Sequence, residues 1–320
     1  MKVNKVSELD LVRSRIGFGC WGIGGGTKIN PAYGKISETK AIELLEFSLK
    51  KKINFFDVSP AYGNSEKLLG FILKKNRRED LIISTKCGVS DFSQKSSFSK
   101  QSIISQIKNS LQVLGTEYID FLQLHNPPKD FLSNMEYFTF IKNLFGKKIR
   151  NFGISLRNPE DFYCINDFSM VDFIQVNFNI LDIRILEKNI YEKCKKMNIK
   201  IIARTPLAFG FLTGKYSAKH IFDEDDHRKF WKIDQRRKWI EESNKIFKKV
   251  VKDENVTRAQ LCLNFCLSFS QIHIVLPGMI NKSQIIENVK AEKIKNLSED
   301  NIKRIKEYNI KYFKFDQYVG

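Results

Sequence analysis

The most constraining feature of this 320-residue sequence is a regular alternation of short apolar runs with amphipathic stretches. Several of the runs are apolar on consecutive residues, which is typical of strands covered on both faces of a parallel sheet. Eight runs of this kind follow one another at even spacing. They lie at residues 15–21, 53–59, 81–87, 119–125, 149–156, 173–178, 200–206 and 272–277.

The stretches between the runs have the apolar spacing of helices. Residues 37–52 show it well, because their apolar side chains recur on one helical face. Ser37 and Ser99 stand where a side chain can cap the first turn of a helix. The other clear helical patterns lie at residues 99–114, 183–198 and 283–293.

A strand followed by a helix, repeated eight times, predicts an α/β fold with a single (β/α)8 TIM barrel. An open, doubly wound sheet is the alternative, but eight evenly spaced units fit a closed barrel better. Length alone would favour two domains, yet no linker or repeat divides the chain. We therefore predict one domain over residues 1–320, with loops at 90–99 after strand 3 and 207–238 after strand 7, and a C-terminal helix from Ser298.

Composition narrows the class of protein. Hydrophobic residues make up 42% and charged residues 28% of the chain, as in ordinary globular proteins. No run approaches the roughly 18 apolar residues of a membrane span, and the first residues lack the apolar core of a signal peptide. The six cysteines are scattered, without a CxxC pair, and only four histidines are present. We therefore predict a cytoplasmic protein with reduced thiols, no membrane association and no metal site.

The net charge of +18 raises the question of an anionic partner. The cations are spread over the predicted outer helices, which is typical of a solvated surface. Residues 228–239 mix cations with aromatic rings, a pattern that can bind nucleic acid, but acidic residues on both sides dilute it. A literal GxGxxG at residues 17–22 does not open a helix, as a dinucleotide fingerprint must. We predict neither a nucleic-acid partner nor a Rossmann domain.

Polar side chains end three neighbouring predicted strands. Asp57 ends the second, Lys86 the third and His125 the fourth, and Tyr62 follows Asp57 by five residues. In a barrel these positions meet at the carboxyl ends of the strands, where active sites lie. Asp57 can balance a buried Lys86, and a nearby cation lowers the pKa of a phenol from about 10. The four residues predict a catalytic site in which Tyr62, with a lowered pKa, is the general acid and His125 bonds the same substrate oxygen.

With these residues in place, the sequence resembles the aldo-keto reductases over about residues 15–295. The motifs occur in the family's order, and as a set they are highly specific. The matching segments are residues 57–63, 83–86, 122–126, 153–155, 175–177, 206–215 and 277–288. The resemblance implies a (β/α)8 barrel that binds NADP(H) in extended form without a Rossmann domain. It also implies reduction of aldehydes and ketones by hydride transfer from the nicotinamide.

The resemblance implies roles for the matched residues. Tyr62 would donate the proton, Lys86 and Asp57 would adjust the acidity of Tyr62, and His125 would orient the carbonyl. Trp21, Tyr62 and His125 would contact the substrate. The residues implied to bind the cofactor are Gly19, Cys20, Trp21, Asp57, Ser155, Gln175, Arg204, Pro206, Leu207, Gly210, Leu212, Gly214, Lys215, Gly278, Lys282, Gln284, Glu287 and Asn288.

Two positions near the nicotinamide depart from the family pattern. By the resemblance, Ser155 and Gln175 would hold the carboxamide of the nicotinamide. Leu156 follows Ser155 where an Asn is usual, which removes one carboxamide partner. Arg204 stands where many members have a Tyr that stacks on the nicotinamide, and a guanidinium plane can stack as well.

The rest of the cofactor would be met by two segments. Residues 207–215 would cover the pyrophosphate, and residues 284–288 would face the adenine. A basic residue is usual just after Gly278 for the adenosine 2′-phosphate, but Ile280 stands in this segment, so Lys282 would have to substitute. The resemblance therefore favours NADP(H), with NAD(H) as the alternative.

Together, these features predict an NAD(P)H-dependent oxidoreductase that reduces an aldehyde or a ketone, or oxidises the alcohol. Two alternatives stay open. One is a regulatory barrel that binds the cofactor with little turnover, which the departures at Leu156 and Arg204 would fit. The other is a sugar- or nucleotide-sugar-modifying oxidoreductase, in which Arg228 and Lys229 form a basic rim for an anionic substrate. The sequence predicts neither the substrate, nor the direction of the reaction, nor the oligomeric state.

Overall fold

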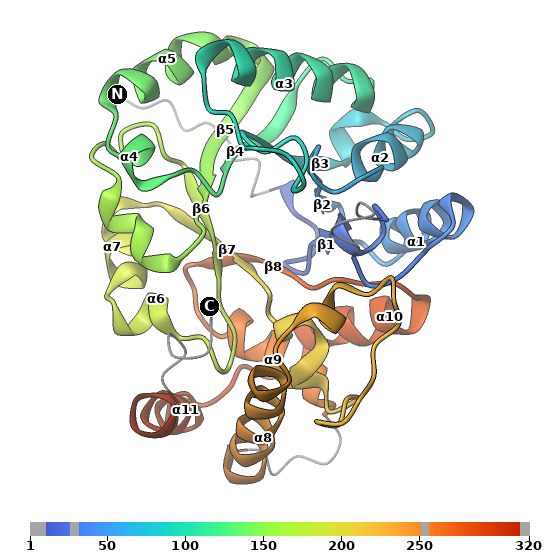
Figure 1. Cartoon of the computed structure of the whole chain (residues 1–320), viewed down its shortest axis with the longest axis vertical. Coiled ribbons are helices and arrows are strands. Elements are labelled where there is room, and N and C mark those ends of the chain that lie inside the picture. Colours follow the sequence, from blue (N-terminus) through green and yellow to red (C-terminus); the bar gives the residue numbers. More distant parts are fainter. Residues whose placement is uncertain (1–10, 26–31, 251–255, 314–320) are drawn as a thin grey trace.

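A ring of eight parallel strands forms the centre of the computed structural model, which describes residues 11–25, 32–250 and 256–313 (Figure 1). Each strand pairs with the next one along the chain. The ring is closed because Ile16 pairs with Val275 and Gly19 with Gly278. The strands are β1 (Phe18–Gly19), β2 (Phe55–Asp57), β3 (Ile82–Cys87), β4 (Ile119–His125), β5 (Ile149–Ser155), β6 (Phe173–Asn177), β7 (Lys200–Arg204) and β8 (Ile272–Leu276). The predicted (β/α)8 barrel is confirmed.

Helices surround the strands (Figure 1). Ser37 and Ser99 cap the first turns of α1 and α3 as predicted, each accepting a hydrogen bond from the backbone N–H three residues on. Within the described residues, no helix is both long and apolar enough to cross a membrane. The α-helices are α1 (Glu38–Lys50), α2 (Ser65–Leu73), α3 (Lys100–Leu114), α4 (Lys129–Leu132), α5 (Met135–Phe145), α6 (Arg184–Glu187), α7 (Ile190–Met197), α8 (Ile233–Val250), α9 (Arg258–Leu267), α10 (Lys282–Lys290) and α11 (Glu299–Tyr312).

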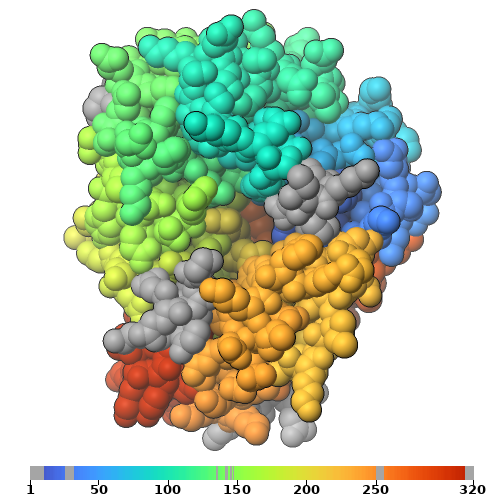
Figure 2. Space-filling model, viewed as in Figure 1, coloured from blue at the N-terminus to red at the C-terminus, as the bar shows by residue number. Residues whose placement is uncertain are grey.

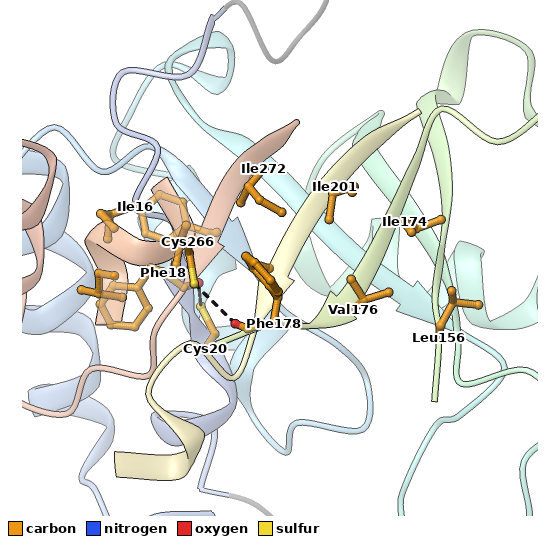
Figure 3. Packing of buried hydrophobic residues seen from close by; sticks show 14 of the residues in the cluster. Ile16, Phe18, Cys20, Leu156, Ile174, Val176, Phe178, Ile201, Cys266 and Ile272 are labelled. Atoms are coloured by element: carbon orange, nitrogen blue, oxygen red, sulfur yellow. Dashed lines mark hydrogen bonds between the residues drawn. The ribbon is translucent and has the colours of Figure 1, made fainter. Parts of the chain in front are cut away.

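The larger part of the core lies between the strands and the helices. Ile174, Val176 and Ile201 belong to it and lie along neighbouring strands (Figure 3). The thiol of Cys266 in α9 donates to the carbonyl oxygen of Phe178 at 3.4 Å. All six cysteines are free thiols, and five of them are buried. The helices are therefore fixed to the barrel by apolar contacts rather than by covalent links.

The smaller part of the core fills the barrel itself. Its members are Phe55, Ile82, Phe121, Phe173, Ile202, Ile274 and Leu276. Because successive side chains of a strand point to opposite faces, a residue two positions further along points inward as well. The positions two residues after the first four of these hold buried polar side chains, namely Asp57, Ser84, Gln123 and Gln175. An apolar layer therefore supports a polar layer nearer the carboxyl ends of the strands.

Some predicted element boundaries are wrong. The helix expected at 183–198 is divided into α6 and α7, because Asn189 adopts a left-handed conformation with φ 57°. The loop expected at 207–238 is shorter, since α8 begins at Ile233. The first strand is only two residues long and runs into a 3-10 turn, η2 (Cys20–Gly22), so the GxGxxG segment opens no α-helix, as predicted. The C-terminal helix, α11, begins after its predicted start, Ser298, which caps it.

Candidate active site

A cavity of about 390 Å³ opens at the carboxyl ends of the strands. On this face the loop after β3 and the segment after β7 lie around a hollow (Figure 2). The structure brings most of the predicted site residues together here. Those lining the cavity are Gly19, Trp21, Asp57, Tyr62, His125, Gln175, Arg204, Pro206, Leu207, Gly210, Lys215, Gly278, Gln284, Glu287 and Asn288.

A buried ion pair lies beneath the cavity. The ammonium of Lys86 donates to Oδ1 of Asp57, and both residues are almost fully buried. Oδ2 of Asp57 accepts three further hydrogen bonds, from Gln175 at 2.7 Å, Gln123 at 3.1 Å and Ser84 at 3.3 Å. Burying a charge is tolerated only with partners of this kind. The ion pair therefore holds Lys86 in one position at the end of β3.

Tyr62 lies over this pair, with Nζ of Lys86 4.6 Å from the centre of its ring. Burial raises the pKa of the Tyr62 phenol, while the charge of Lys86 lowers it by less, so the net shift is upward. The predicted lowering of this pKa is therefore wrong, because burial outweighs the cation. Burial lowers the pKa of Lys86, but Asp57 and Tyr62 raise it by more, and the lysine stays charged.

His125, the last residue of β4, packs edge to face on Tyr62, with ring centroids 5.7 Å apart. Its Nδ1 lies 3.3 Å from Oγ of Ser59. Burial, together with the charges of Lys86 and Arg204, lowers the pKa of His125 well below 6.5. The imidazole is therefore neutral near pH 7, and a neutral imidazole has one N–H donor and one acceptor nitrogen.

The two departures from the family pattern contact each other. Arg204 donates through Nη2 to the carbonyl oxygen of Leu156 at 2.8 Å, while its Nε is buried and has no partner among the described residues. Beside them, Ser155 donates to Oε1 of Gln175 at 3.4 Å. The amide NH2 of Gln175 bonds Asp57, so its Oε1 side faces Ser155. Arg204 is therefore tied to the backbone of the residue that stands where an Asn is usual.

The segment after β7 has a strained backbone that curves over the cavity. Ala208, Phe209 and Gly210 have φ values of 42°, 56° and 92°, and Gly214 has φ 76°. Left-handed residues other than glycine are uncommon, and strain of this kind concentrates at ligand sites. Lys215 follows this turn and lines the cavity. A glycine-containing turn that ends in a cation is a chemically suitable cover for a pyrophosphate.

The far end of the cavity is formed by α10. Gln284, Glu287 and Asn288 line it, and Nδ2 of Asn288 is buried without a partner among the described residues. The backbone N–H of Ile280 donates to Oε1 of Gln284 at 2.8 Å, which orients that side chain. Two side chains of one cavity lining, Arg204 and Asn288, thus each have a buried polar atom without a partner among the described residues. A ligand with several polar groups, such as a dinucleotide, fits this arrangement.

Six predicted residues lie outside the lining that the described residues form, namely Cys20, Lys86, Ser155, Leu212, Gly214 and Lys282. Lys86 and Ser155 act through hydrogen bonds to lining residues. Cys20 and Leu212 are buried. Lys282 reaches instead towards Glu43 of α1, 3.6 Å away, and about half of its side chain is exposed.

Sequence reasoning missed an aromatic wall of the cavity. Tyr33, Phe209, His227 and Trp231 line one side, and Phe92, from the loop after β3, packs on His125 with centroids 5.4 Å apart. Three of the five lie in the predicted loop 207–238, whose aromatic content was the available signal. Periodicity does not determine which loop side chains point inward, so this signal did not distinguish them.

The basic rim of Arg228 and Lys229, which the alternative of an anionic substrate would require, is present only in part. Arg228 lines the cavity, but it is buried, and its guanidinium donates to both carboxylate oxygens of Asp226 and, at 3.1 Å, to the carbonyl oxygen of Phe209. Lys229 pairs with Glu224 and lies outside the lining that the described residues form. Both cations are therefore paired with carboxylates of the segment after β7, and of the two it is Arg228 that lines the cavity.

Comparisons with known proteins agree with this geometry. The sequence model of the Aldo/keto reductase family matches residues 15–310. The NADH-specific methylglyoxal reductase of Escherichia coli (strain K12) is 28% identical over 308 residues, which cover 91% of this chain and 93% of that protein. L-galactose dehydrogenase of Arabidopsis thaliana is 28% identical over 303 residues, covering 91% and 88%. The solved holo form of aldo-keto reductase AKR11C1 from Bacillus halodurans is 25% identical, with a TM-score of 0.70, covering 92% of this chain and 91% of that one.

Proposed function

The chain belongs to the aldo/keto reductase family, and from this premise we propose that it reduces an aldehyde or a ketone, or oxidises the corresponding alcohol, with Tyr62 as the general acid. One observation carries the proposal. Tyr62, His125 and the buried pair of Asp57 and Lys86 meet at one end of a cavity whose other end can hold the rest of a dinucleotide. When bound, NAD(P)H supplies the hydride.

Tyr62 is suited to hold the proton until the carbonyl oxygen becomes basic. Burial keeps its pKa raised, so the phenol is protonated at neutral pH. When the proton leaves, the phenolate lies beside the ammonium of Lys86, which stabilises the new charge in a site shielded from water. Asp57 keeps that ammonium in place. The cation thus favours the product of proton transfer more than the starting phenol.

His125 is suited to donate to the same oxygen. Oγ of Ser59 accepts from the N–H of Ala61 at 3.2 Å. Among the described residues, Nδ1 of His125 is the acceptor within reach of the Ser59 hydroxyl hydrogen. The hydroxyl therefore donates to Nδ1, and the single proton of the neutral ring lies on Nε2. This tautomer leaves an N–H donor for the substrate oxygen.

Turnover and cofactor binding test the proposal together. We expect oxidation of NADPH or NADH with a panel of aldehydes and ketones. Tyr62→Phe should lower kcat by roughly 10²- to 10⁴-fold, because it removes the proton and little else, while cofactor affinity measured by protein-fluorescence quenching stays the same. A fully active Tyr62→Phe enzyme would contradict this mechanism. Tight cofactor binding without turnover on any carbonyl would favour a regulatory barrel.

The choice of cofactor depends on the adenosine 2′-phosphate. Ile280 lines the cavity, whereas Lys282 reaches towards Glu43. An apolar side chain offers that phosphate no partner, so the prediction of NADP(H) has no support from these two residues. Titrating NADPH and NADH in parallel decides between them. Equal or tighter binding of NADH contradicts the prediction of NADP(H), and Ile280→Arg should then shift the preference towards NADPH.

A further inference from the structure

Two polar atoms, one on His227 of the aromatic wall and one on Trp21, which packs against it, are buried without a partner among the described residues. They are Nε1 of Trp21 and Nε2 of His227. Both residues line the cavity, and their rings pack edge to face with centroids 4.5 Å apart. Buried polar atoms are nearly always hydrogen-bonded, so an exception in a cavity indicates a place for a ligand group.

The hydrogen-bond character of these two atoms is opposite. Nδ1 of His227 lies 2.8 Å from the carbonyl oxygen of Ala32, which can only accept, so Nδ1 carries the ring proton. Burial lowers the pKa of His227 to about 4, and the ring is neutral at pH 7. Nε2 is therefore an acceptor. Nε1 of Trp21 is a donor and can be nothing else.

The wall holds both rings in fixed positions. Tyr33 packs against both of them, with its centroid 5.3 Å from Trp21 and 5.1 Å from His227. Phe209 packs against both rings as well, at 6.2 Å from Trp21 and 5.4 Å from His227. Both rings line the same cavity as Tyr62, so the subsite would lie in the space that holds the proposed proton donor.

We propose that Trp21 and His227 form a subsite for a hydroxyl group of the substrate, so that hydroxylated aldehydes or ketones are preferred over plain ones. A hydroxyl accepts and donates through a single oxygen, and so it matches one donor and one acceptor on adjacent rings. A carboxylate or phosphate would leave Nε2 of His227 facing an anion without a proton between them. The inference rests on the proposed function, because it concerns the substrate of the same cavity.

Two aldehydes that differ by one hydroxyl group test this subsite. The quantity measured is the ratio of kcat/KM for lactaldehyde to kcat/KM for propanal, in the wild type and in variants. His227→Asn keeps an amide N–H near the position of Nδ1, for the bond to Ala32, and removes the acceptor. Trp21→Phe removes the donor. Trp231→Phe makes the same chemical change elsewhere in the wall and is the matched control.

Each single variant should lower the ratio about tenfold, because a neutral hydrogen bond is lost and its partner is left unpaired. The control should leave the ratio within about twofold. The intrinsic reactivities of the two aldehydes cancel in this comparison. A ratio that does not change in His227→Asn and Trp21→Phe, or that falls as far in Trp231→Phe, overturns the subsite.

A binding measurement separates this inference from the proposed function. We expect 1,2-propanediol to bind the cofactor complex about tenfold more tightly than 1-propanol, and to lose that advantage in His227→Asn. Protein fluorescence reports the binding. Absence of turnover with both aldehydes would contradict the proposed function alone, because binding of the two alcohols still tests the subsite of Trp21 and His227. Equal binding of the two alcohols by the wild type would overturn the subsite even in an active enzyme.

Discussion

Strand β4 carries a buried polar cluster at each end, and the two clusters are built differently. At its amino end, Asp120 accepts from Arg78 at 2.6 Å, from the N–H of Ile83 at 2.9 Å and from Arg150 at 3.4 Å. Both guanidinium groups stack on Tyr118, at 3.9 and 3.7 Å. Nε, Nη1 and Nη2 of Arg78 all have acceptors. This cluster is complete within the protein itself.

The cluster at the carboxyl end also contains a buried aspartate and its cation, Asp57 and Lys86, but it leaves polar groups unused. Five polar atoms of the described cavity side chains have no partner, namely Nε1 of Trp21, Oδ1 of Asn126, Nε of Arg204, Nε2 of His227 and Nδ2 of Asn288. A buried group that lacks a partner destabilises the fold by about 1–3 kcal/mol. The same group becomes an advantage when a ligand supplies the missing partner. In a barrel of this kind, the amino end, where the cluster is complete, supports stability, and the carboxyl end, where it is incomplete, binds the ligand.

The largest expected difference between the two ends follows from Lys86→Met. Removing the ammonium should lower kcat by about 10³-fold or more, because the Tyr62 phenolate loses its stabilising charge. It should also lower the free energy of unfolding by about 3 kcal/mol, since Asp57 stays buried without a cation. Steady-state kinetics and urea unfolding measure the two effects. The double variant Asp57→Asn/Lys86→Met should regain stability and remain inactive; recovery of activity would contradict a catalytic role for the lysine.

Arg78→Met is the matching change at the complete end. It should lower the free energy of unfolding by about 3 kcal/mol, because of its described partners Asp120 then keeps Arg150 and one backbone N–H. The values of kcat and KM for the folded fraction should stay within about twofold of the wild type, since Arg78 lies at the opposite end of the barrel from the cavity. A loss of kcat comparable to that of Lys86→Met would remove the distinction between the two ends.

His227 extends the comparison to pH. Burial, the largest cause, lowers its pKa in the folded state to about 4, and Asp226 and Arg228 beside it have opposing smaller effects. The unfolded ring, with a pKa of about 6.5, takes up a proton first on acidification. The neutral ring of folded His227 therefore does not destabilise the protein above pH 6.5. As the pH falls from 6.5 towards 4, the free energy of unfolding decreases by roughly 3 kcal/mol on account of this residue.

The variant His227→Asn should show less of this acid destabilisation. His125 also has a lowered pKa, but it is present in both proteins, so its effect cancels in the difference. Urea unfolding at pH 7, 6, 5 and 4 measures that difference. Parallel pH profiles for the two proteins would show that the ring of His227 is not kept neutral by burial.

Regular periodicity explains why so much of the site could be predicted. Asp57, Lys86 and His125 end strands, and the barrel geometry alone brings strand ends together. The net direction of the Tyr62 pKa could not be predicted, because it depends on how far burial outweighs a neighbouring charge. Lys282 was placed by its position in a motif, but its side chain turns towards α1. Loop paths, side-chain directions and burial depend on tertiary packing, which no local pattern contains.

Ser59→Ala is the variant with the smallest expected effect on the incomplete end of the barrel. Ser59 lies two residues after Asp57, and it was overlooked because a serine in a turn is common. If its hydroxyl sets the tautomer of His125, Ser59→Ala should lower kcat/KM by about tenfold, the value of one hydrogen bond, while stability changes by less than about 1.5 kcal/mol. Ser59→Thr keeps the hydroxyl and should restore most of the activity. A merely structural serine would lower stability and leave kcat unchanged. The Nε2–H signal of His125 in the NMR spectrum, present in the wild type and weakened in Ser59→Ala, distinguishes the two roles.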